Sequence, residues 1–398
     1  MNNKSIEDYG YTEFFKNQTK LYNMKEKDLI VGRVIEVQKS KYKIISEYGE
    51  KNAILKGSVF FYEDEDKIYP SVGDFVLVKR NLYGEDVIYK VLERKTKFSR
   101  MDPDSETEQV VATNFDYVFI MTSLNHDFNI KRIERYLTIA YESGATPVIV
   151  LTKLDLCNDY ETYIERIRDV CIGVPIIPIS SVTKEGIENL SEYIKPMKTI
   201  VFLGSSGVGK SSLVNLMASE SIMKVSGIRE CDSRGRHTTT HRELIILKNG
   251  GMIIDTPGMR VLGMWNAQDG INENFTDIEE VISKCKFSNC HHDSEPGCKV
   301  KEALENGNLS IERWNNYLKL QREIEFAKRK ENIRNNKSSK NKYNKNELDL
   351  ALDLLENGYS HCKVTKDTNL NKSIVTREMR KRKNLKTKKT IEKKILYK

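Results

Sequence analysis

The chain lacks any long apolar run. Among its 398 residues, no hydrophobic stretch approaches the roughly 20 residues that a helix needs to cross a bilayer. The first residues, Met-Asn-Asn-Lys-Ser, also lack the apolar core of a secretory signal peptide. We therefore expect a cytoplasmic protein with no membrane partner. The length exceeds the usual size of one hydrophobic core, which predicts two or three domains.

Cysteine is scarce, with seven residues in the whole chain. Four of them are scattered along the sequence, as expected for reduced thiols in the cytosol. These four are Cys157, Cys171, Cys231 and Cys362. The other three lie close together with a histidine.

A phosphate-binding loop is indicated by residues 204–211, which read Gly-Ser-Ser-Gly-Val-Gly-Lys-Ser. An apolar strand precedes the loop and helix-forming residues follow it. Backbone N–H groups of such a loop, together with the positive end of the following helix, hold phosphate oxygens. Lys210 can reach the β- and γ-phosphates, and the Ser211 hydroxyl can bind Mg²⁺. The alternative is a chance Gly/Ser loop, which the strand–loop–helix context disfavours.

A second string, Thr-Lys-Leu-Asp at residues 152–155, lies before the phosphate loop in the chain. It follows an apolar strand, at the sheet edge where α/β proteins bind ligands. The Asp155 carboxylate can accept two N–H bonds from guanine, whereas adenine offers a mismatched pattern. Lys153 is expected to lie along the base, and Ser180 and Ser181 end a second strand that could support it. The alternative is an ordinary strand-end loop; agreement among the parts favours guanine.

A third string runs from Asp255 to Gly258 and has the pattern D-x-x-G. Asp255 can hold Mg²⁺, and the N–H of Gly258 can sense a γ-phosphate. The glutamine that follows this glycine in familiar GTPases, where it orients the attacking water, is replaced by Met259. His237, within the polar segment 235–240, is the best substitute because a neutral imidazole can position water. The alternative is a histidine that only bonds a loop carbonyl.

The order of these motifs resembles that of the circularly permuted GTPases of the ribosome small-subunit-dependent GTPase A family, over about residues 25–325. The resemblance implies hydrolysis of GTP to GDP and phosphate with Mg²⁺, stimulated by the small ribosomal subunit, in late maturation of that subunit and its rRNA. It implies catalytic roles for His237, Lys210 and Thr239, with Mg²⁺ held by Ser211 and Asp255. The implied GTP-binding residues are Thr152, Lys153, Leu154, Asp155, Ser180, Ser181, Gly204, Ser205, Ser206, Gly207, Val208, Gly209, Lys210, Ser211, Ser212, Asp255 and Gly258.

The clustered cysteines form the pattern Cys285-x4-Cys290-x-His292-x5-Cys298. Three thiolates and an imidazole favour tetrahedral Zn²⁺, and four protein ligands leave no position open for a substrate. We therefore expect one structural Zn²⁺. A disulfide plus a free cysteine is the alternative, which a cytosolic location disfavours. His291 is the rival imidazole, and the C-x-H spacing of the resembled family favours His292.

Short strands upstream predict a small β domain of the five-stranded OB type, a fold that often binds oligonucleotides. The strand-like segments are Leu29–Val37, Tyr42–Ile45, Asn52–Leu55 and Asp74–Val78. Charged and aromatic residues on them are candidates for RNA contact, with a merely solvated charged face as the alternative. These candidates are Arg33, Lys39, Lys41, Tyr42 and Lys43. The polar segment 98–109 is predicted to be a linker.

The C-terminus is strongly basic, with 22 Lys and Arg against 8 Asp and Glu in residues 328–398, a net charge of +14. The whole chain carries +8, so residues 1–327 carry −6. Residues 335–342 are predicted to be a flexible spacer, followed by helices at 347–358 and 360–368 and a third after Asn371. This pattern resembles a helix-turn-helix of the resolvase type. The alternative is a partly helical tail that binds rRNA phosphates without reading bases.

The sequence thus predicts a multidomain α/β monomer. Its expected parts are an N-terminal OB-type β-barrel, a circularly permuted P-loop GTPase domain with a mostly parallel sheet, and a zinc-binding helical module with a basic tail. The boundaries are 1–26 for an N-terminal extension, 27–97 for the barrel, 98–270 for the GTPase domain, 271–330 for the zinc domain and 331–398 for the tail. The alternative function is a GTP-switched regulator that binds other nucleic acid through the tail.

Overall fold

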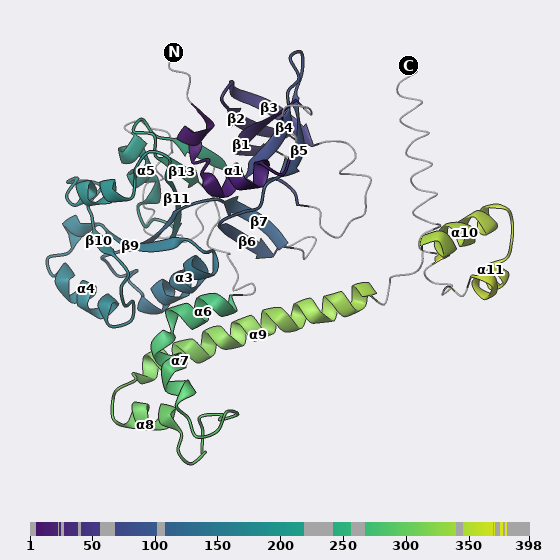
Figure 1. The fold of residues 1–398 in the computed structure, drawn as a ribbon. Helices are drawn as coiled ribbons and strands as arrows, with labels where there is room; N and C mark the ends of the chain where they lie inside the picture. Colours follow the sequence, from purple (N-terminus) through teal and green to yellow (C-terminus); the bar gives the residue numbers. More distant parts are fainter. Residues whose placement is uncertain are drawn as a thin grey trace. The chain divides into compact units, whose positions relative to one another are not determined.

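In a computed structural model, the chain divides into two compact units, Met1–Ala327 and Lys328–Lys398 (Figure 1). The residues that the structure describes are 5–22, 24, 28–38, 41–55, 68–101, 108–218, 242–255, 267–339, 345–368, 370, 375, 376 and 379. Among them, no helix is both long enough and apolar enough to cross a membrane.

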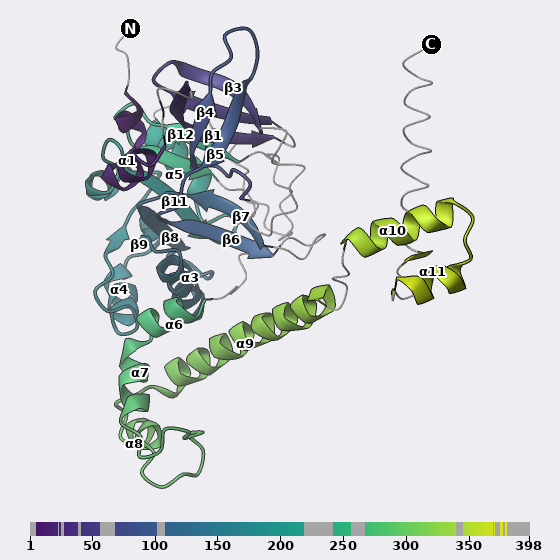
Figure 2. The same ribbon diagram turned by 45° about the vertical axis from the view of Figure 1, so that its right-hand side comes forward.

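The N-terminal part of the first unit is a five-stranded barrel, as the sequence predicts. Its strands are β1 (Leu29–Gln38), β2 (Lys41–Ser46), β3 (Gly49–Leu55), β4 (Phe75–Lys79) and β5 (Asp86–Val91). The strands pair in the order β1-β2-β3-β5-β4, and β4 returns to β1, which closes the barrel (Figure 2). Only β3 and β5 run parallel to each other. The fifth strand was not singled out in the sequence.

The N-terminal extension packs on the outside of the barrel through a short 3₁₀ helix, η1 (Ile6–Tyr9), and a helix, α1 (Glu13–Thr19). The ring of Phe15 lies 4.3 Å from that of Phe75 in β4, measured between centroids. Tyr11 and Leu29 join the same buried cluster.

The GTPase sheet is built from β8 (Tyr117–Ser123), β9 (Thr146–Thr152), β10 (Ile176–Pro178), β11 (Thr199–Gly204), β12 (Glu243–Ile246) and β13 (Met252–Asp255). Their order is β10-β9-β8-β11-β13-β12, and all except β12 are parallel. Parallel strands covered on both faces are apolar throughout. In β8, Val118 and Ile120 pack in one core cluster, and Phe119 and Met121 pack in the other.

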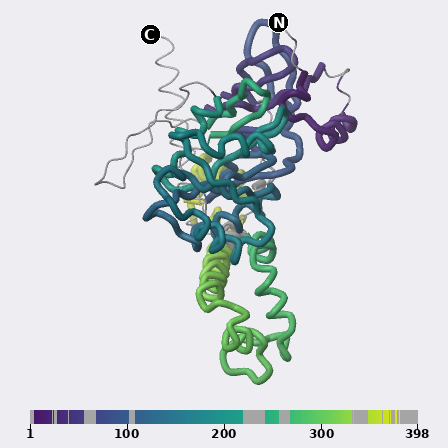
Figure 3. The backbone as a smooth tube through the Cα atoms, turned by 90° about the vertical axis from the view of Figure 1, so that its left-hand side faces the viewer, coloured from purple at the N-terminus to yellow at the C-terminus, as the bar shows by residue number. Residues whose placement is uncertain are grey.

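Helices follow these strands. They are α3 (Ile130–Glu142), α4 (Tyr160–Arg168), α5 (Lys210–Ala218), α6 (Gln268–Asn274), α7 (Thr276–Ser283), α8 (Lys299–Glu305) and α9 (Ile311–Ser339), with short 3₁₀ turns η2 (Leu154–Leu156) and η3 (Ile187–Glu192). Of these helices, α3, α4 and α5 pack their buried residues in the two core clusters of the sheet. Within the first unit, the segment that carries α7 and α8 lies at the end opposite the barrel (Figure 3).

The described ends of the expected linker at 98–109, residues 98–101 and 108–109, lie instead in two paired β-strands. Strands β6 (Lys97–Met101) and β7 (Glu108–Thr113) pair in antiparallel fashion. Phe98 is only 2% exposed, and its ring lies 4.6 Å from that of Phe115. Burial of Phe98 against the GTPase core outweighs the polar composition of the segment, so the linker prediction was wrong.

The prediction of a flexible spacer at 335–342 is also wrong for residues 335–339, because α9 continues through Ser339. No glycine or proline interrupts this stretch, so a charged helix can continue through it. Residues 340–344 are outside the described part. The second unit contains α10 (Lys345–Glu356) and α11 (His361–Asp367), close to the predicted ranges. A small core of Ala351, Val364, Leu370 and Val375 joins them, and the proposed cap Asn371 lies outside the described residues.

Two of the predicted RNA contacts are wrong, because Arg33 and Tyr42 are buried. Arg33 is 1% exposed and donates to the carbonyl oxygens of Tyr9 at 2.6 Å and Asn114 at 2.8 Å. It therefore joins the N-terminal extension and the barrel to the GTPase sheet. Burial lowers the pKa of Arg33 to about 10.

The two remaining candidates that the structure describes on the barrel are each paired with a glutamate. Lys41 pairs with Glu85, and Lys43 pairs with Glu50, each at 2.5 Å. Lys39 lies outside the described residues.

Candidate functional site

The phosphate loop lies between β11 and α5, at the carboxyl edge of the sheet. β11 sits between β8 and β13, so the loop has a parallel strand on each side. Gly207 and Gly209 have φ angles of +73° and +102°, which side-chain-bearing residues rarely adopt. A Cβ on Gly204 would lie 2.9 Å from the carbonyl oxygen of Met121, so this glycine allows close approach of β8. The glycines of the motif thus shape the loop.

The two strings that occur in reversed order along the chain meet at this edge. The Thr152 hydroxyl, at the end of β9, donates to the carbonyl oxygen of Val208 in the phosphate loop at 2.6 Å. Thr152 is buried, and Lys153 after it adopts a left-handed φ of +62°. This bond fastens the expected base-reading string directly to the expected phosphate-binding string.

Asp155 and Ser180 also come together. The Ser180 hydroxyl donates to Asp155 Oδ1 at 2.5 Å, and it accepts from the N–H groups of Val182 and Thr183, each at 3.1 Å. Ser180 is fully buried, and Leu154 N donates to Ile179 O at 3.1 Å. The two strand ends therefore hold the Asp155 carboxylate in a defined place.

Ser181 follows at the same edge and is half-buried.

On the other side of the loop, Asp255 ends β13 and lies 3.8 Å from the Lys210 ammonium. Lys210, Ser211 and Ser212 form the first turn of α5. The structure thus brings the expected Mg²⁺ ligands Ser211 and Asp255 to the same side of the phosphate loop. Gly258, His237 and Thr239 lie outside the described residues.

A ladder of acidic residues connects Asp255 with the barrel. Glu243 in β12 pairs with Asp255 in β13 on one side and with Glu36 in β1 on the other. Burial and then the nearby Glu36 raise the pKa of Glu243. The barrel strand β1 is therefore only two strands away from Asp255, and like charges face each other where the barrel joins the GTPase sheet.

The candidate metal centre lies between α7 and α8. The ligand atoms of Cys285, Cys290, His292 and Cys298 all lie within 4.8 Å of one another. His292 Nδ1 is 3.7 Å from Cys285 Sγ and 3.6 Å from Cys298 Sγ. Tetrahedral Zn²⁺ with its usual bond lengths would place a sulfur and a nitrogen ligand about 3.6 Å apart. The donor set and its spacing fit a structural zinc ion.

The loop between the ligands is organised by Glu295. Its carboxylate accepts from the N–H groups of His291, Asp293 and Ser294 at 2.8, 3.1 and 3.2 Å. These backbone bonds lower the pKa of Glu295 to about 2. His292 adopts a φ of +61°, which turns its ring into the cluster, whereas His291 is not part of it.

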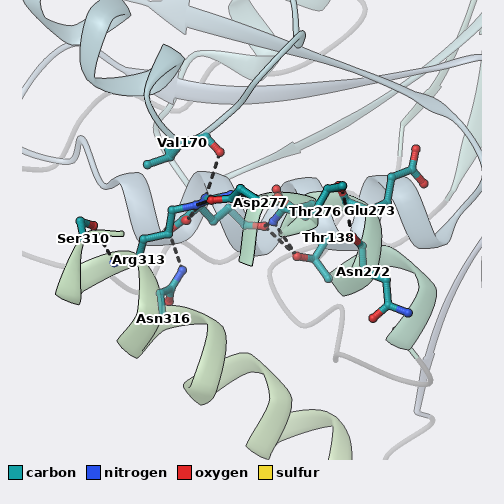
Figure 4. Close-up of polar contacts among 11 residues, drawn as sticks. Thr138, Val170, Asn272, Glu273, Thr276, Asp277, Ser310, Arg313 and Asn316 are labelled. Carbon is teal, nitrogen blue, oxygen red and sulfur yellow. Dashed lines mark hydrogen bonds and ion pairs between the residues drawn. The ribbon is translucent and has the colours of Figure 1, made fainter. Parts of the chain in front are cut away.

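An interaction that no sequence motif indicated links α9, which follows the candidate metal centre in the chain, with the GTPase domain (Figure 4). Arg313, which is 7% exposed, donates to Glu134 on α3 at 2.8 Å and to both oxygens of Asp277 on α7 at 2.6 and 2.8 Å. The carbonyl oxygens of Val170 and Asn274 accept as well, at 3.0 and 3.1 Å. One buried guanidinium therefore joins α9 to α3, α6 and α7 and to the loop at Val170.

The fold and the loop define a P-loop GTPase in which the strand that ends at Thr152 precedes the phosphate loop. Residues 91–265 match the family described as RsgA GTPase. A "Small ribosomal subunit biogenesis GTPase RsgA 2" from Listeria monocytogenes is 48% identical over 330 residues, 82% of this chain and 91% of that protein. A "Small ribosomal subunit biogenesis GTPase RsgA" from Methanosarcina acetivorans is 38% identical over 79% of this chain and 85% of its own length.

Solved structures agree with this assignment. YjeQ from Thermotoga maritima matches with a TM-score of 0.55 and 28% identity, over 74% of this chain and 98% of that one. YloQ, described as a circularly permuted GTPase, matches with a TM-score of 0.54 and 27% identity, over 75% and 95% of the two chains. The chain belongs to the RsgA GTPase family, and as a P-loop GTPase it hydrolyses GTP.

Proposed function

We propose that this protein hydrolyses GTP during late maturation of the small ribosomal subunit, as a cytoplasmic monomer that contacts the subunit and its rRNA. The printed names of the curated relatives describe GTPases of small-ribosomal-subunit biogenesis. The observation that best supports nucleotide binding is the hydrogen bond from the Thr152 hydroxyl to the carbonyl oxygen of Val208, because it joins two strings that are distant in the sequence.

Each part of this site has a distinct task in the proposed reaction. Asp155, fixed by Ser180, accepts N–H bonds from guanine, and the phosphate loop surrounds the phosphates through its N–H groups. Lys210 offsets the charge that develops on the γ-phosphate. A Mg²⁺ ion held by Ser211 and Asp255 would supply further positive charge to the phosphates.

The remaining roles belong to residues outside the described part. We assign His237 to the placement of the attacking water, Thr239 to the switch position and the Gly258 N–H to the γ-phosphate. The substitution His237→Ala should slow hydrolysis and leave GTP affinity unchanged.

For the metal centre, we propose that Cys285, Cys290, His292 and Cys298 hold one structural Zn²⁺. All four positions are protein ligands, so the ion would stabilise the segment between α7 and α8 rather than take part in hydrolysis.

Turnover of GTP with and without isolated small subunits tests the function. Hydrolysis should rise on addition of the subunits, and Lys210→Ala should weaken both GTP binding and hydrolysis. The substitution Asp155→Asn should relax the preference for guanine over other bases while the phosphates remain bound. Equal turnover with and without subunits would contradict the ribosomal role, and a preference for ATP would contradict the nucleotide assignment.

A second function, binding of other nucleic acid, is favoured by the separate core of α10 and α11 together with the net charge of +14 on residues 328–398. Deletion of residues 340–398 leaves α9 whole. If subunit-stimulated turnover survives the deletion, the tail is an accessory. If the deletion abolishes ribosome binding and the full chain binds duplex DNA, the regulator function gains support.

A further inference from the structure

The loop that follows β8 runs beside the phosphate loop. β8 and β11 are parallel neighbours with Met121 opposite Gly204, so their carboxyl ends meet at one edge of the sheet. Residues 124–129 leave β8 at that edge and lead into α3. This loop contributes an acidic side chain to the phosphate loop, which none of the sequence motifs indicated.

The acidic side chain is Asp127, which connects Ser205 in the phosphate loop with Arg132 on α3. Ser205 Oγ donates to Asp127 Oδ2 at 2.5 Å, and the Arg132 guanidinium donates to the same oxygen at 2.9 Å. Burial by itself would raise the pKa of Asp127, but the hydrogen bonds from Ser205 and Arg132 outweigh it and lower the pKa. The carboxylate is therefore ionised at neutral pH, and both bonds are charge-assisted.

Local bonds fix Asp127 and its counter-ion independently of the phosphate loop. Asn125 Oδ1 accepts from the N–H of Asp127 at 3.0 Å and from the Ser123 hydroxyl at 2.8 Å. Asn129 caps α3 and accepts from the N–H of Arg132 at 3.1 Å. Asp127 is thus an anchor to which the phosphate loop is attached.

Charge explains why the anchor needs Arg132. A lone carboxylate next to a phosphate loop would repel the phosphates of GTP, and a cation in contact with it cancels most of that repulsion. A phosphate loop works by presenting several N–H groups at once, and a tether at its start reduces the freedom that binding has to remove.

We propose that Asp127 is a positioning residue for the nucleotide: it holds the start of the phosphate loop through Ser205, while Arg132 neutralises its charge. This inference rests on the assignment of residues 204–212 to the phosphates. It goes beyond that assignment because it adds two residues from a different strand–helix unit to the site.

Equilibrium binding of GTP and GDP, with steady-state hydrolysis on the same full-length proteins, tests the proposal. The substitution Ser205→Ala removes a charge-assisted bond and should raise the dissociation constants of both nucleotides alike, by roughly tenfold. Because the tether acts equally on the ground state and the transition state, the KM for GTP should rise by a larger factor than kcat falls. Asp127→Asn keeps an oxygen for Ser205 and should lose less affinity than Asp127→Ala.

Arg132→Gln leaves the carboxylate uncompensated and should weaken GTP more than GDP, since GTP carries the additional γ-phosphate. Added salt should reduce this difference. The matched control is Arg135→Gln, which removes the same charge from α3 at a position that pairs with Glu323 instead. The control should bind both nucleotides as the wild type does.

The positioning role is wrong if Ser205→Ala leaves both dissociation constants unchanged, or if Arg132→Gln and Arg135→Gln weaken GTP binding equally. It is also wrong if Asp127→Asn loses as much affinity as Asp127→Ala while both melt at the wild-type temperature. A different result would point elsewhere: if the wild type itself binds no GTP, the assignment of the phosphate loop fails rather than this inference.

Discussion

Removal of the Arg313 guanidinium should strongly destabilise the junction between α9 and the GTPase domain (Figure 4). Breaking a buried ion pair by removing one partner costs about 3–5 kcal/mol, because the other charge stays buried. Glu134 is 2% exposed and cannot be rehydrated, whereas the Asp277 side chain is 36% exposed and can be. We therefore expect Arg313→Met to cost about 3 kcal/mol, at the lower end of that range.

Trp314 is one of two tryptophans and is buried next to Arg313, so its fluorescence can follow thermal unfolding of this junction. The midpoint should fall by roughly 6 °C in Arg313→Met. The matched control is Arg135→Met, because Arg135 and Glu323 join the same two helices through a pair whose side chains are about a third exposed. Such a pair contributes about 0–1 kcal/mol, so the control should melt within roughly 2 °C of the wild type.

The loss of stability in Arg313→Met should also depend on pH. Burial raises the pKa of Glu134, and Arg313 partly opposes that rise. Without Arg313 the pKa of folded Glu134 rises further above its unfolded value, so the folded variant gains stability as the pH falls and loses it as the pH rises through the folded pKa. The gap from wild type should therefore shrink from pH 7.5 to pH 5.5, and Glu134→Gln added to Arg313→Met should recover stability. This reasoning would be refuted if the difference in stability between wild type and Arg313→Met were the same at both pH values and were not reduced by Glu134→Gln.

Three further outcomes are expected. His292→Ala should lose the bound zinc measured by atomic absorption, whereas His291→Ala should keep it; the reverse would exchange their roles. Glu243→Gln should raise the thermal midpoint slightly, because opposed like charges across strands cost about 0.2–1 kcal/mol, and exposed Glu47→Gln should leave it unchanged. Arg33→Lys should destabilise the barrel, because an ammonium cannot reach all the carbonyl groups that the guanidinium fork bonds; a wild-type midpoint for this variant would show that those bonds contribute little.

The strand-end motifs could be located from the sequence because their geometry follows from topology. Parallel strands end at one edge, so strings after β9, β11 and β13 must converge whatever their order along the chain. The barrel was predictable for a similar reason, since short apolar strands separated by turn residues have few ways to close. The close spacing of three cysteines and a histidine likewise allowed the candidate metal centre to be predicted, because all four residues lie within one short segment.

The errors arose where a side chain's role depends on distant backbone. Arg33 looks like a surface charge on a strand, and only the fold brings Tyr9 O and Asn114 O to it. Phe98 lies in a polar stretch, and only the position of Phe115 explains its burial. Arg313 and Glu134 are separated by 179 residues, so no local pattern relates them.

These distant contacts hold both flanks of the D-x-x-G string in folded structure. Asp255, the first residue of the string and the last of β13, belongs to a ladder that continues through Glu243 to Glu36 in the barrel. After it, α6 and α7 are bound by Arg313 to α3 and α9. Among the described residues, paired strands therefore connect the barrel with Asp255, and the bonds of Arg313 connect the helices beside the candidate metal centre with α3 of the GTPase domain.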